Sequence, residues 1–279
     1  MLGVASGAIL VPLNSTMLAV ALPGVMSEFG LGANTVSSLV TLYLGAVAVA
    51  LPVGGSLGDR FGHRRTFLVG VAGFAGASLI AALAGSFVVL EVTRVLQAVT
   101  GALISTSAAS LIRETAPEHR RGEAFGLFDL LVSTSAAIGP FIGGVAVGAF
   151  GWRSLFFLAI PIAIVAAVLV GIVLRPSSSG HPAPLAPDAL ADGPADWPDE
   201  PALRTAPAPR PIDVPGLLLL GLVIVAFLLA LRGESVGPLG FIALVAVIPL
   251  AVAFVAIELR REQPAVDPRL FLRRPFAAA

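Results

Sequence analysis

The chain has 279 residues, of which 57% are hydrophobic and 12% charged, against roughly 25% charged residues in an ordinary soluble domain. Its seventeen basic and seventeen acidic residues balance to a net charge of zero, so the composition gives no polybasic surface for nucleic acid. The chain has no cysteine, so it offers no disulfide, thiolate nucleophile or zinc–sulfur site. The high hydrophobic fraction and the low charged fraction are those of an integral membrane protein.

Long apolar stretches set the predicted architecture, since about 20 apolar residues are needed to cross a bilayer as a helix. The sequence predicts eight such helices, at about residues 4–25, 36–57, 66–84, 88–112, 122–147, 153–174, 214–232 and 238–258. The first is interpreted as a span rather than a signal peptide, because no basic residue precedes it and polar side chains interrupt it. The predicted fold class is all-α, in a polytopic membrane protein.

The arginines predict how these helices are oriented, because short cytoplasmic loops are enriched in basic residues. With the N-terminus inside the cell, fourteen arginines fall in cytoplasmic segments and only Arg153 and Arg232 fall in outer loops. We therefore expect a multi-pass protein of the plasma membrane with a cytoplasmic N-terminus.

Three consecutive polar residues, Asn14, Ser15 and Thr16, interrupt the first span. Side chains that form hydrogen bonds need partners or a wet cavity at this depth, which makes Asn14 and Thr16 candidates for lining a cavity. The simpler interpretation is that serine and threonine bond back to carbonyls of their own helix.

The sequence GGSLGDRFGHRR at 54–65, called the gating segment below, is predicted to be a very short charged loop between the second and third spans. Glycine allows close helix approach and positive φ in a tight turn, and we expect a charge cluster of Asp59 with the two adjacent arginines. Arginines are common in any short cytoplasmic loop, so composition alone leaves a purely topological interpretation open. The residues singled out are Gly55, Gly58, Asp59, Arg60, Gly62, Arg64 and Arg65.

One basic residue, Arg94, lies within a predicted span, and an ionisable group at that depth is costly enough to indicate function. Gln97 follows one helical turn later on the same face. The alternative is that Arg94 reaches outward and pairs with Glu91, three residues away, as a structural tie.

An internal repeat relates GGSLGDRFGHRRTF at 54–67 to GGVAVGAFGWRSLF at 143–156, at an offset of 89 residues. In the predicted topology one copy faces the cytoplasm and the other faces outside. This arrangement indicates two three-helix units in opposite orientation, a pattern typical of secondary transporters. Chance similarity between glycine-rich segments is the alternative.

The second part of the chain changes character, because residues 175–213 are rich in proline, alanine and acidic residues. This composition predicts a disordered cytoplasmic linker. The predicted domains are a six-helix transmembrane N-domain at 1–174, the linker, two further transmembrane helices at 214–258, and a basic cytoplasmic tail at 259–279. A further helix could begin where the tail ends, so we expect a truncation point there.

Several of these segments resemble motifs of the major facilitator superfamily of transporters. The gating segment resembles its G-x-L-x-D-R-x-G-R-R loop, with His63 where a basic residue often stands, and this implies a cytoplasmic gating role. The stretch TRVLQA resembles the motif R-x-x-Q-G, with Ala98 in place of glycine. That resemblance implies that Arg94 and Gln97 face a central cavity and that the arginine takes part in proton coupling.

Two further segments resemble the fourteen-helix drug:proton antiporter family within that superfamily. LNSTMLAVALP resembles L-D-x-T-x-x-x-V-A-L-P with Asn14 at the aspartate, so this chain cannot use an acid there to carry a proton. AIGPFIGG resembles the end of the antiporter motif G-x-x-x-G-P-x-x-G-G, whose first glycine is Ser135 here. Its matching residues are Gly139, Pro140, Gly143 and Gly144.

The resemblance implies the N-terminal portion of an exporter that moves small molecules or drugs by proton-coupled efflux and alternating access. The expected partners are the lipid bilayer, a small-molecule substrate, protons, and either a missing C-terminal half or a second copy. The alternative is a half-length membrane protein without transport activity that acts as an interaction or regulatory subunit. No catalytic, metal, cofactor or nucleic-acid role is expected, because the sequence has no activated nucleophile, metal-ligand spacing or phosphate loop.

Overall fold

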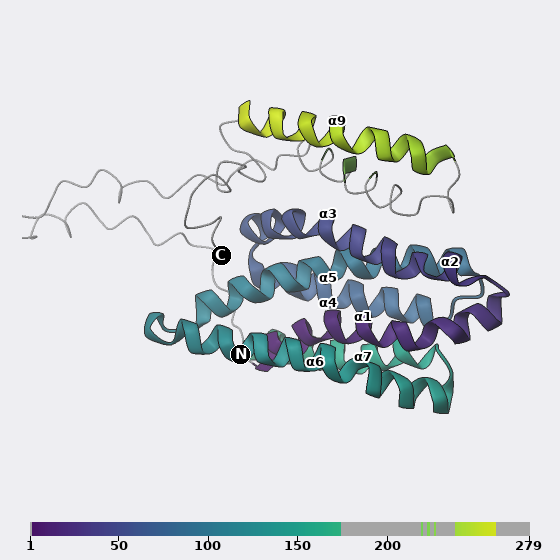
Figure 1. Ribbon diagram of the computed structural model, residues 1–279. Coiled ribbons are helices and arrows are strands. Elements are labelled where there is room, and N and C mark those ends of the chain that lie inside the picture. Colours follow the sequence, from purple (N-terminus) through teal and green to yellow (C-terminus); the bar gives the residue numbers. More distant parts are fainter. Residues whose placement is uncertain (1, 174–218, 220–221, 224–225, 227–237, 261–279) are drawn as a thin grey trace, which may run out of the picture.

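The computed structural model describes residues 2–173, 219, 222, 223, 226 and 238–260 of the chain. Six helices in this part are long and apolar enough to cross a membrane (Figure 1). They are α1 (Leu2–Phe29), α3 (Ser38–Phe61), α4 (His63–Ala82), α5 (Phe87–Thr115), α6 (Arg121–Phe150) and α7 (Ser154–Val173). Short α2 (Ala33–Val36) precedes α3, the 3₁₀ helix η1 (Glu118–Arg120) precedes α6, and α9 spans Pro238–Arg260.

The first six predicted spans and the eighth coincide with helices of the structure. Several helices run beyond the predicted ends, as α1 does to Phe29 and α5 to Thr115, because a helix continues into polar sequence after its apolar stretch is complete. The predicted span at 214–232 falls mostly outside the described residues, and the predicted linker at 175–213 falls entirely outside them.

The gating segment is mostly helical, so the prediction of a loop there was wrong. α3 continues through Phe61 and α4 begins at His63, which leaves only Gly62 between them. Gly62 takes a φ of +89°, a value that favours glycine and lets the chain reverse within one residue. Within this stretch, Gly54 of α3 packs closely on α5, where an added Cβ would lie 3.1 Å from the Ala102 carbonyl oxygen.

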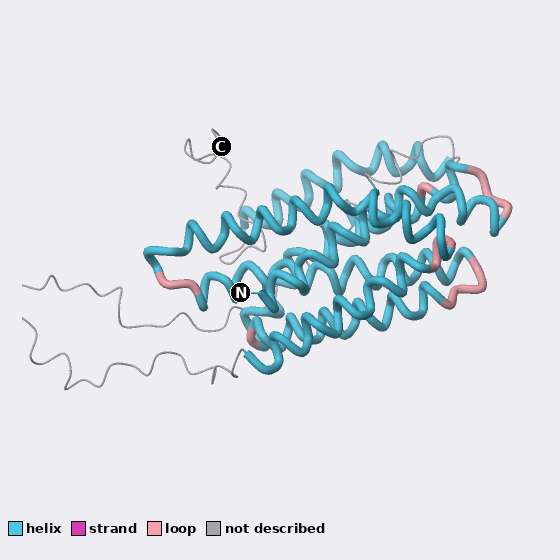
Figure 2. Tube along the Cα trace, turned by 90° about the horizontal axis from the view of Figure 1, so that it is seen from below, coloured by secondary structure: helices cyan, strands magenta, loops and turns pink. Residues whose placement is uncertain are grey.

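The loops gather at two ends of the bundle, which we name the Gly62 end and the Gly151 end (Figure 2). At the Gly62 end, the start of α4 reaches the end of α7, where Arg64 Nη2 donates to the Gly171 carbonyl oxygen at 2.9 Å. At the Gly151 end, the start of α7 reaches the end of α1 through Arg153 and Glu28, whose Nη1 and Oε2 atoms are 2.6 Å apart.

The helices form two units, α1–α3–α4 and α5–α6–α7, that match the predicted inverted repeat. Gly62 and Gly151 each follow a phenylalanine, end a helix and take positive φ, at +89° and +77°, but lie at opposite ends of the bundle. Gly54 packs on α5 and Gly143, 89 residues later, packs on α1. Each unit therefore places an equivalent glycine against the first helix of the other unit.

The main helix contacts cross between the two units. α3 and α4 pack on α5, α6 and α7 pack on α1, and α4 also packs on α7. The helix order in space thus has an approximate twofold relation, as two inverted copies of one three-helix unit require.

The interior contains two apolar clusters with a polar layer between them. The cluster toward the Gly62 end includes Phe67 and Phe74 of α4 and Ile104 of α5, and the cluster toward the Gly151 end includes Leu90 and Trp152. Along α4 and α5, the sequence between the two clusters contains the buried polar residues Ser78, Arg94 and Gln97, and on α1 the buried Asn14 follows Leu13 of the second cluster. We call these four side chains, together with the Tyr43 ring that covers Arg94, the polar layer.

The Gly151 end is held by a compact set of polar contacts between α1, the α4–α5 loop and α7. Glu28 Oε2 accepts hydrogen bonds from Trp152 Nε1 at 2.7 Å and from Arg153 Nη1 at 2.6 Å. Arg153 Nη2 also donates to the Ala84 carbonyl oxygen at 2.8 Å, and its guanidinium carbon lies 4.3 Å from the Trp152 ring centroid. These contacts tie the two units together at this end.

Candidate functional site

The polar layer is built around Arg94 of α5, whose residue is 1% exposed. Its Nη1 atom donates hydrogen bonds to Asn14 Oδ1 of α1 at 2.6 Å and to Gln97 Oε1 at 2.9 Å. Gln97 Nε2 donates in turn to Ser78 Oγ of α4 at 2.8 Å. A continuous chain of hydrogen bonds therefore connects α1, α5 and α4 in the interior of the bundle.

Tyr43 of α3 completes the layer, because the Arg94 guanidinium carbon lies 4.2 Å from its ring centroid. The ring face carries partial negative charge and attracts the cation. The Arg94 Nε atom is buried and has no hydrogen-bond partner within the described part of the chain. The Tyr43 hydroxyl is buried next to the side chain of Ser15 of α1. Sequence analysis missed Tyr43 and Ser78. The first could have been noticed as the one tyrosine of the chain, placed in an apolar span.

The alternative in which Arg94 pairs with Glu91 was wrong. Arg94 turns inward toward Asn14 and Gln97, and Glu91 instead accepts a hydrogen bond from Ser38 of α3. The reason is burial and not spacing, because Glu91 and Gln97 are both three residues from Arg94, but Gln97 is buried while Glu91 is only partly buried. Among the described residues no carboxylate lies within ion-pair distance of Arg94.

The three polar residues of α1 divide between the two interpretations made from the sequence. Asn14 enters the polar layer, whereas Ser15 Oγ donates back to the Val11 carbonyl oxygen at 2.8 Å. Thr16 Oγ1 likewise lies 3.0 Å from the Pro12 carbonyl oxygen of its own helix. Thr16 is therefore satisfied locally, and its side chain faces α6 rather than Arg94.

The glycines of the predicted antiporter motif differ in their contacts. Gly139 and Gly143 of α6 are buried against α1, where a Cβ on Gly139 would overlap the Thr16 hydroxyl and a Cβ on Gly143 would lie 3.2 Å from Met17 Cα. Gly144 has no atom within 4 Å of such a Cβ in the described part, and Pro140 is exposed. Two of the four motif residues thus form the α1–α6 contact.

The gating segment forms contacts at the Gly62 end that differ from the predicted charge cluster. His63 Nε2 lies 3.4 Å from Asp59 Oδ1 on α3 and 3.8 Å from Glu114 Oε1 on α5. Arg64 donates to the end of α7 instead of pairing with Asp59, and Arg65 is exposed. The carboxylate of Asp59 therefore faces a histidine on the next helix, and the predicted pairing of Asp59 with the two arginines was wrong.

The remaining residues of the gating segment have simple surroundings. The guanidinium carbon of Arg60 lies 5.5 Å from the Phe61 ring centroid, and Gly58 is buried where an added Cβ would overlap the His63 ring. Gly55 has open space around its Cβ position in the described part. Gly58 and Gly62 are thus the glycines that the turn between α3 and α4 requires.

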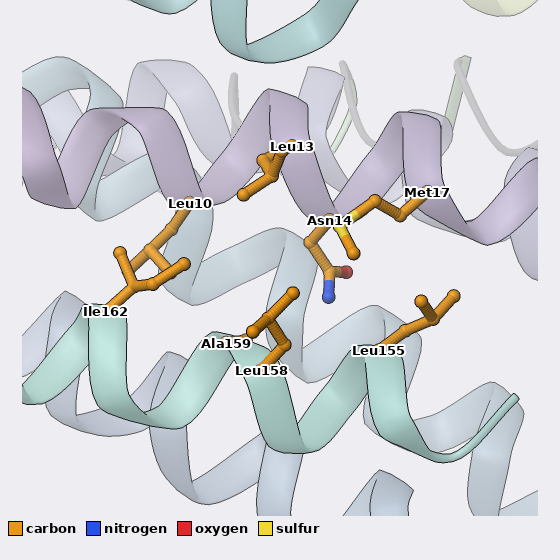
Figure 3. Close-up of a pocket in the computed structure, with 8 residues that line it drawn as sticks. All are labelled: Leu10, Leu13, Asn14, Met17, Leu155, Leu158, Ala159 and Ile162. Carbon is orange, nitrogen blue, oxygen red and sulfur yellow. The ribbon is translucent and has the colours of Figure 1, made fainter. Parts of the chain in front are cut away.

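A small cavity lies between α1 and α7, beside the polar layer (Figure 3). Its lining is apolar except for Asn14, the residue that also accepts from Arg94. The apolar residues that line it are Leu10, Leu13, Met17, Leu155, Leu158, Ala159 and Ile162.

Comparison with known proteins bears on the identity of this bundle. The family model described as Major Facilitator Superfamily matches residues 4–257. The chain belongs to the major facilitator superfamily. This confirms the resemblance drawn from the motifs, and the six helices constitute a multi-pass membrane bundle of that superfamily.

Several bacterial proteins of the superfamily are similar to the chain. The tetracenomycin C resistance and export protein of Streptomyces glaucescens is 42% identical over 66% of this chain and 34% of its own length. The uncharacterized MFS-type transporter YvkA of Bacillus subtilis is 34% identical over 98% of this chain and 55% of its own length. The probable actinorhodin transporter of Streptomyces coelicolor is 34% identical over 94% of this chain and 42% of its own length.

Solved structures of the superfamily share the fold. A peptide transporter POT bound to sulfate superposes with a TM-score of 0.63 at 19% identity, covering 94% of this chain and 52% of that one. A D-xylose–proton symporter gives a TM-score of 0.52 at 17% identity, covering 61% of this chain and 47% of that one. The chain spans between about a third and just over half the length of the superfamily relatives described above.

Proposed function

We propose that this superfamily chain takes part in proton-coupled export of small molecules by alternating access. The observation that carries the proposal is the polar layer, in which a buried arginine binds side chains from α1, α3 and α5. A buried cation is costly in a membrane bundle and is retained where substrates or ions pass. Three relatives whose names describe export, efflux or transport of antibiotics or drugs support export as the direction of transport and such compounds as the substrate class.

The roles proposed for the site residues follow their places in the bundle. The cavity and the proton-coupling centre are formed by Arg94, Gln97 and Asn14. Thr16 acts through its contact with α6. The gating segment at the Gly62 end acts as a conformational latch. The α1–α6 contact is made by two residues of the antiporter motif, which comprises Gly139, Pro140, Gly143 and Gly144.

The proposed organisation extends beyond the described bundle. Residues 1–174 form the N-domain, 175–213 a cytoplasmic linker, 214–258 two further membrane helices and 259–279 a cytoplasmic tail. The protein lies in the plasma membrane, with the Gly62 end facing the cytoplasm. A second six-helix half, either from a longer chain or from a second copy, supplies the surface against which this bundle rocks. The relatives named above are described as transporters, which favours this proposal over a regulatory subunit.

Export is tested in cells that lack their own drug exporters and produce the protein from its complete gene. We expect these cells to expel a panel of antibiotics and dyes, and to lose this ability when a protonophore collapses the proton gradient. Export that persists without the gradient would contradict proton coupling. Absence of export, with the protein present in the membrane at normal levels, would contradict the transport function itself.

Asp59→Asn is expected to slow efflux roughly five- to tenfold without changing the amount of protein in the membrane. Asp59 lies in the last turn of α3, and its Oδ1 atom is 3.4 Å from Nε2 of His63, the first residue of α4, so its carboxylate links the two helices across the turn. The measurement is the initial rate of dye efflux. Glu123→Gln serves as the control, because Glu123 is exposed in the first turn of α6 at the same end. Equal rates for the two variants would refute the latch.

A further inference from the structure

The groups that contact Arg94 in the described part of the chain are neutral. The two hydrogen bonds of Arg94 reach the amide oxygens of Asn14 and Gln97, and its guanidinium faces the neutral ring of Tyr43. The acid nearest to it in the sequence, Glu91, is bound by Ser38. Within residues 2–173 no carboxylate pairs with Arg94, so the interior of this bundle carries one uncompensated positive charge.

Amide oxygens satisfy hydrogen-bond donors but do not neutralise a charge. Buried charges in proteins are normally paired with an opposite charge, and this need is greater inside a membrane. The layer also contains a buried donor for which the described chain provides no acceptor, Arg94 Nε. A bound anion would supply both the missing negative charge and the missing acceptor.

The surroundings of the layer indicate which kind of anion would fit. Asn14 is the polar member of an otherwise apolar cavity lining between α1 and α7, so apolar surface lies directly beside the cationic centre (Figure 3). The cavity has room only for a water-sized group, so it is the apolar side chains beside the cationic centre, and not the volume of the cavity, that favour an anion with a hydrophobic body. An inorganic anion would match the charge and the donor alone.

We propose that the polar layer recognises an anionic group, such as a carboxylate or a phenolate, and so gives the exporter a preference for organic anions. This inference rests on the proposed function and names the substrate class of the same site. Arg94 attracts the anion through its charge. Asn14 acts as a specificity-determining residue because it holds the guanidinium without neutralising it.

Asn14→Asp tests the proposal, since it replaces an amide by a carboxylate of the same shape, 2.6 Å from Arg94 Nη1. The new carboxylate would pair with the guanidinium and compete with any anionic substrate. Efflux is measured for matched pairs of dyes with one ring system, such as fluorescein as the anion and rhodamine 123 as the cation. We expect the wild-type protein to prefer the anions, and the variant to lower the ratio of anion to cation efflux by at least about tenfold.

The matched control is Asn34→Asp, the same substitution at the exposed Asn34 of α2. It adds the same charge outside the polar layer, so the efflux ratio should stay at the wild-type value. A ratio in Asn14→Asp equal to that of the control would overturn the proposal. Loss of both dyes in Asn14→Asp, at a normal protein level, would also overturn it, because the layer would then be needed irrespective of substrate charge.

The outcomes for the wild-type protein separate this inference from the proposed function. Export of the cationic dyes alone would overturn the anion preference and leave the export function standing. Export of neither kind of dye, nor of any compound in the wider panel, would count against the export function, and the inference would fall with it.

A binding measurement on the purified full protein distinguishes the source of the anion. Fluorescein binding is followed by polarisation while chloride or benzoate is added as a competitor at equal ionic strength. Displacement by chloride would assign the site to inorganic anions as well, whereas displacement by benzoate alone would assign it to the organic anion. Binding that Asn14→Asp leaves unchanged would overturn the site in either case.

Discussion

Arg94→Ala abolishes efflux, with a fall of roughly a hundredfold or more, while the protein still inserts into the membrane at near-normal levels. The substitution removes the charge on which the polar layer is built. It leaves Asn14 Oδ1 and Gln97 Oε1 without their common donor, at a cost of about 1–3 kcal/mol for a buried unsatisfied group. The variant no longer has to bury an unpaired cation, and this gain offsets part of that cost. We therefore expect the variant to fold.

The measurement is dye efflux from cells together with the quantity of protein in the membrane fraction. Arg113→Ala is the matched control, because Arg113 is an exposed arginine in the last turn of the same helix. Arg94→Lys should restore only part of the activity, since an ammonium keeps the charge but lacks the planar fork of donors. Wild-type efflux from Arg94→Ala would show that the buried cation plays no part in transport.

Gly139→Val is expected to destabilise the bundle by about 3 kcal/mol, because added side chains in a well-packed contact force helices apart. A Cβ at this position would overlap the Thr16 hydroxyl and lie 3.3 Å from the Leu13 carbonyl oxygen, so α6 must move away from α1. The α1–α6 packing is one of the main contacts between the two units. The measurement is the thermal midpoint of the purified protein in detergent.

Gly144→Val is the control for that experiment, since no described atom lies within 4 Å of a Cβ at Gly144. Its thermal midpoint should stay close to that of the wild-type protein, although both glycines belong to one sequence motif. The smaller change Gly139→Ala should be partly rescued by Thr16→Ala, which removes the overlapping hydroxyl. Equal midpoints for the two valine variants would mean that α1 and α6 do not approach closely at Gly139.

The sequence predicted the membrane bundle well because its signal is simple. Runs of apolar residues mark the spans, and the pair Phe61–Gly62 repeated at Phe150–Gly151 marks two turns that need positive φ. The gating segment was mispredicted for the same reason. Charged residues end an apolar run but do not end a helix, and α3 continues past Asp59 to Phe61.

The polar layer could be predicted only in part. Arg94 and Asn14 stood out because charged and amide side chains are rare in apolar spans. Ser78 did not, because a serine usually bonds to its own helix, and Ser78 does so while also accepting from Gln97. The choice between Asn14 and Glu91 as the partner of Arg94 depends on how α1 and α3 pack around α5, which no local pattern encodes.

The contacts between the two units bear on how the chain is assembled during synthesis. α1, α3 and α4 find their main packing partners in α5, α6 and α7, which the ribosome makes later. The first three helices therefore enter the bilayer before those partners exist. Asn14 and Ser78 meet polar groups of α5 only once Arg94 and Gln97 have been synthesised. Each three-helix unit of the repeat therefore completes its main helix packing only against the other unit.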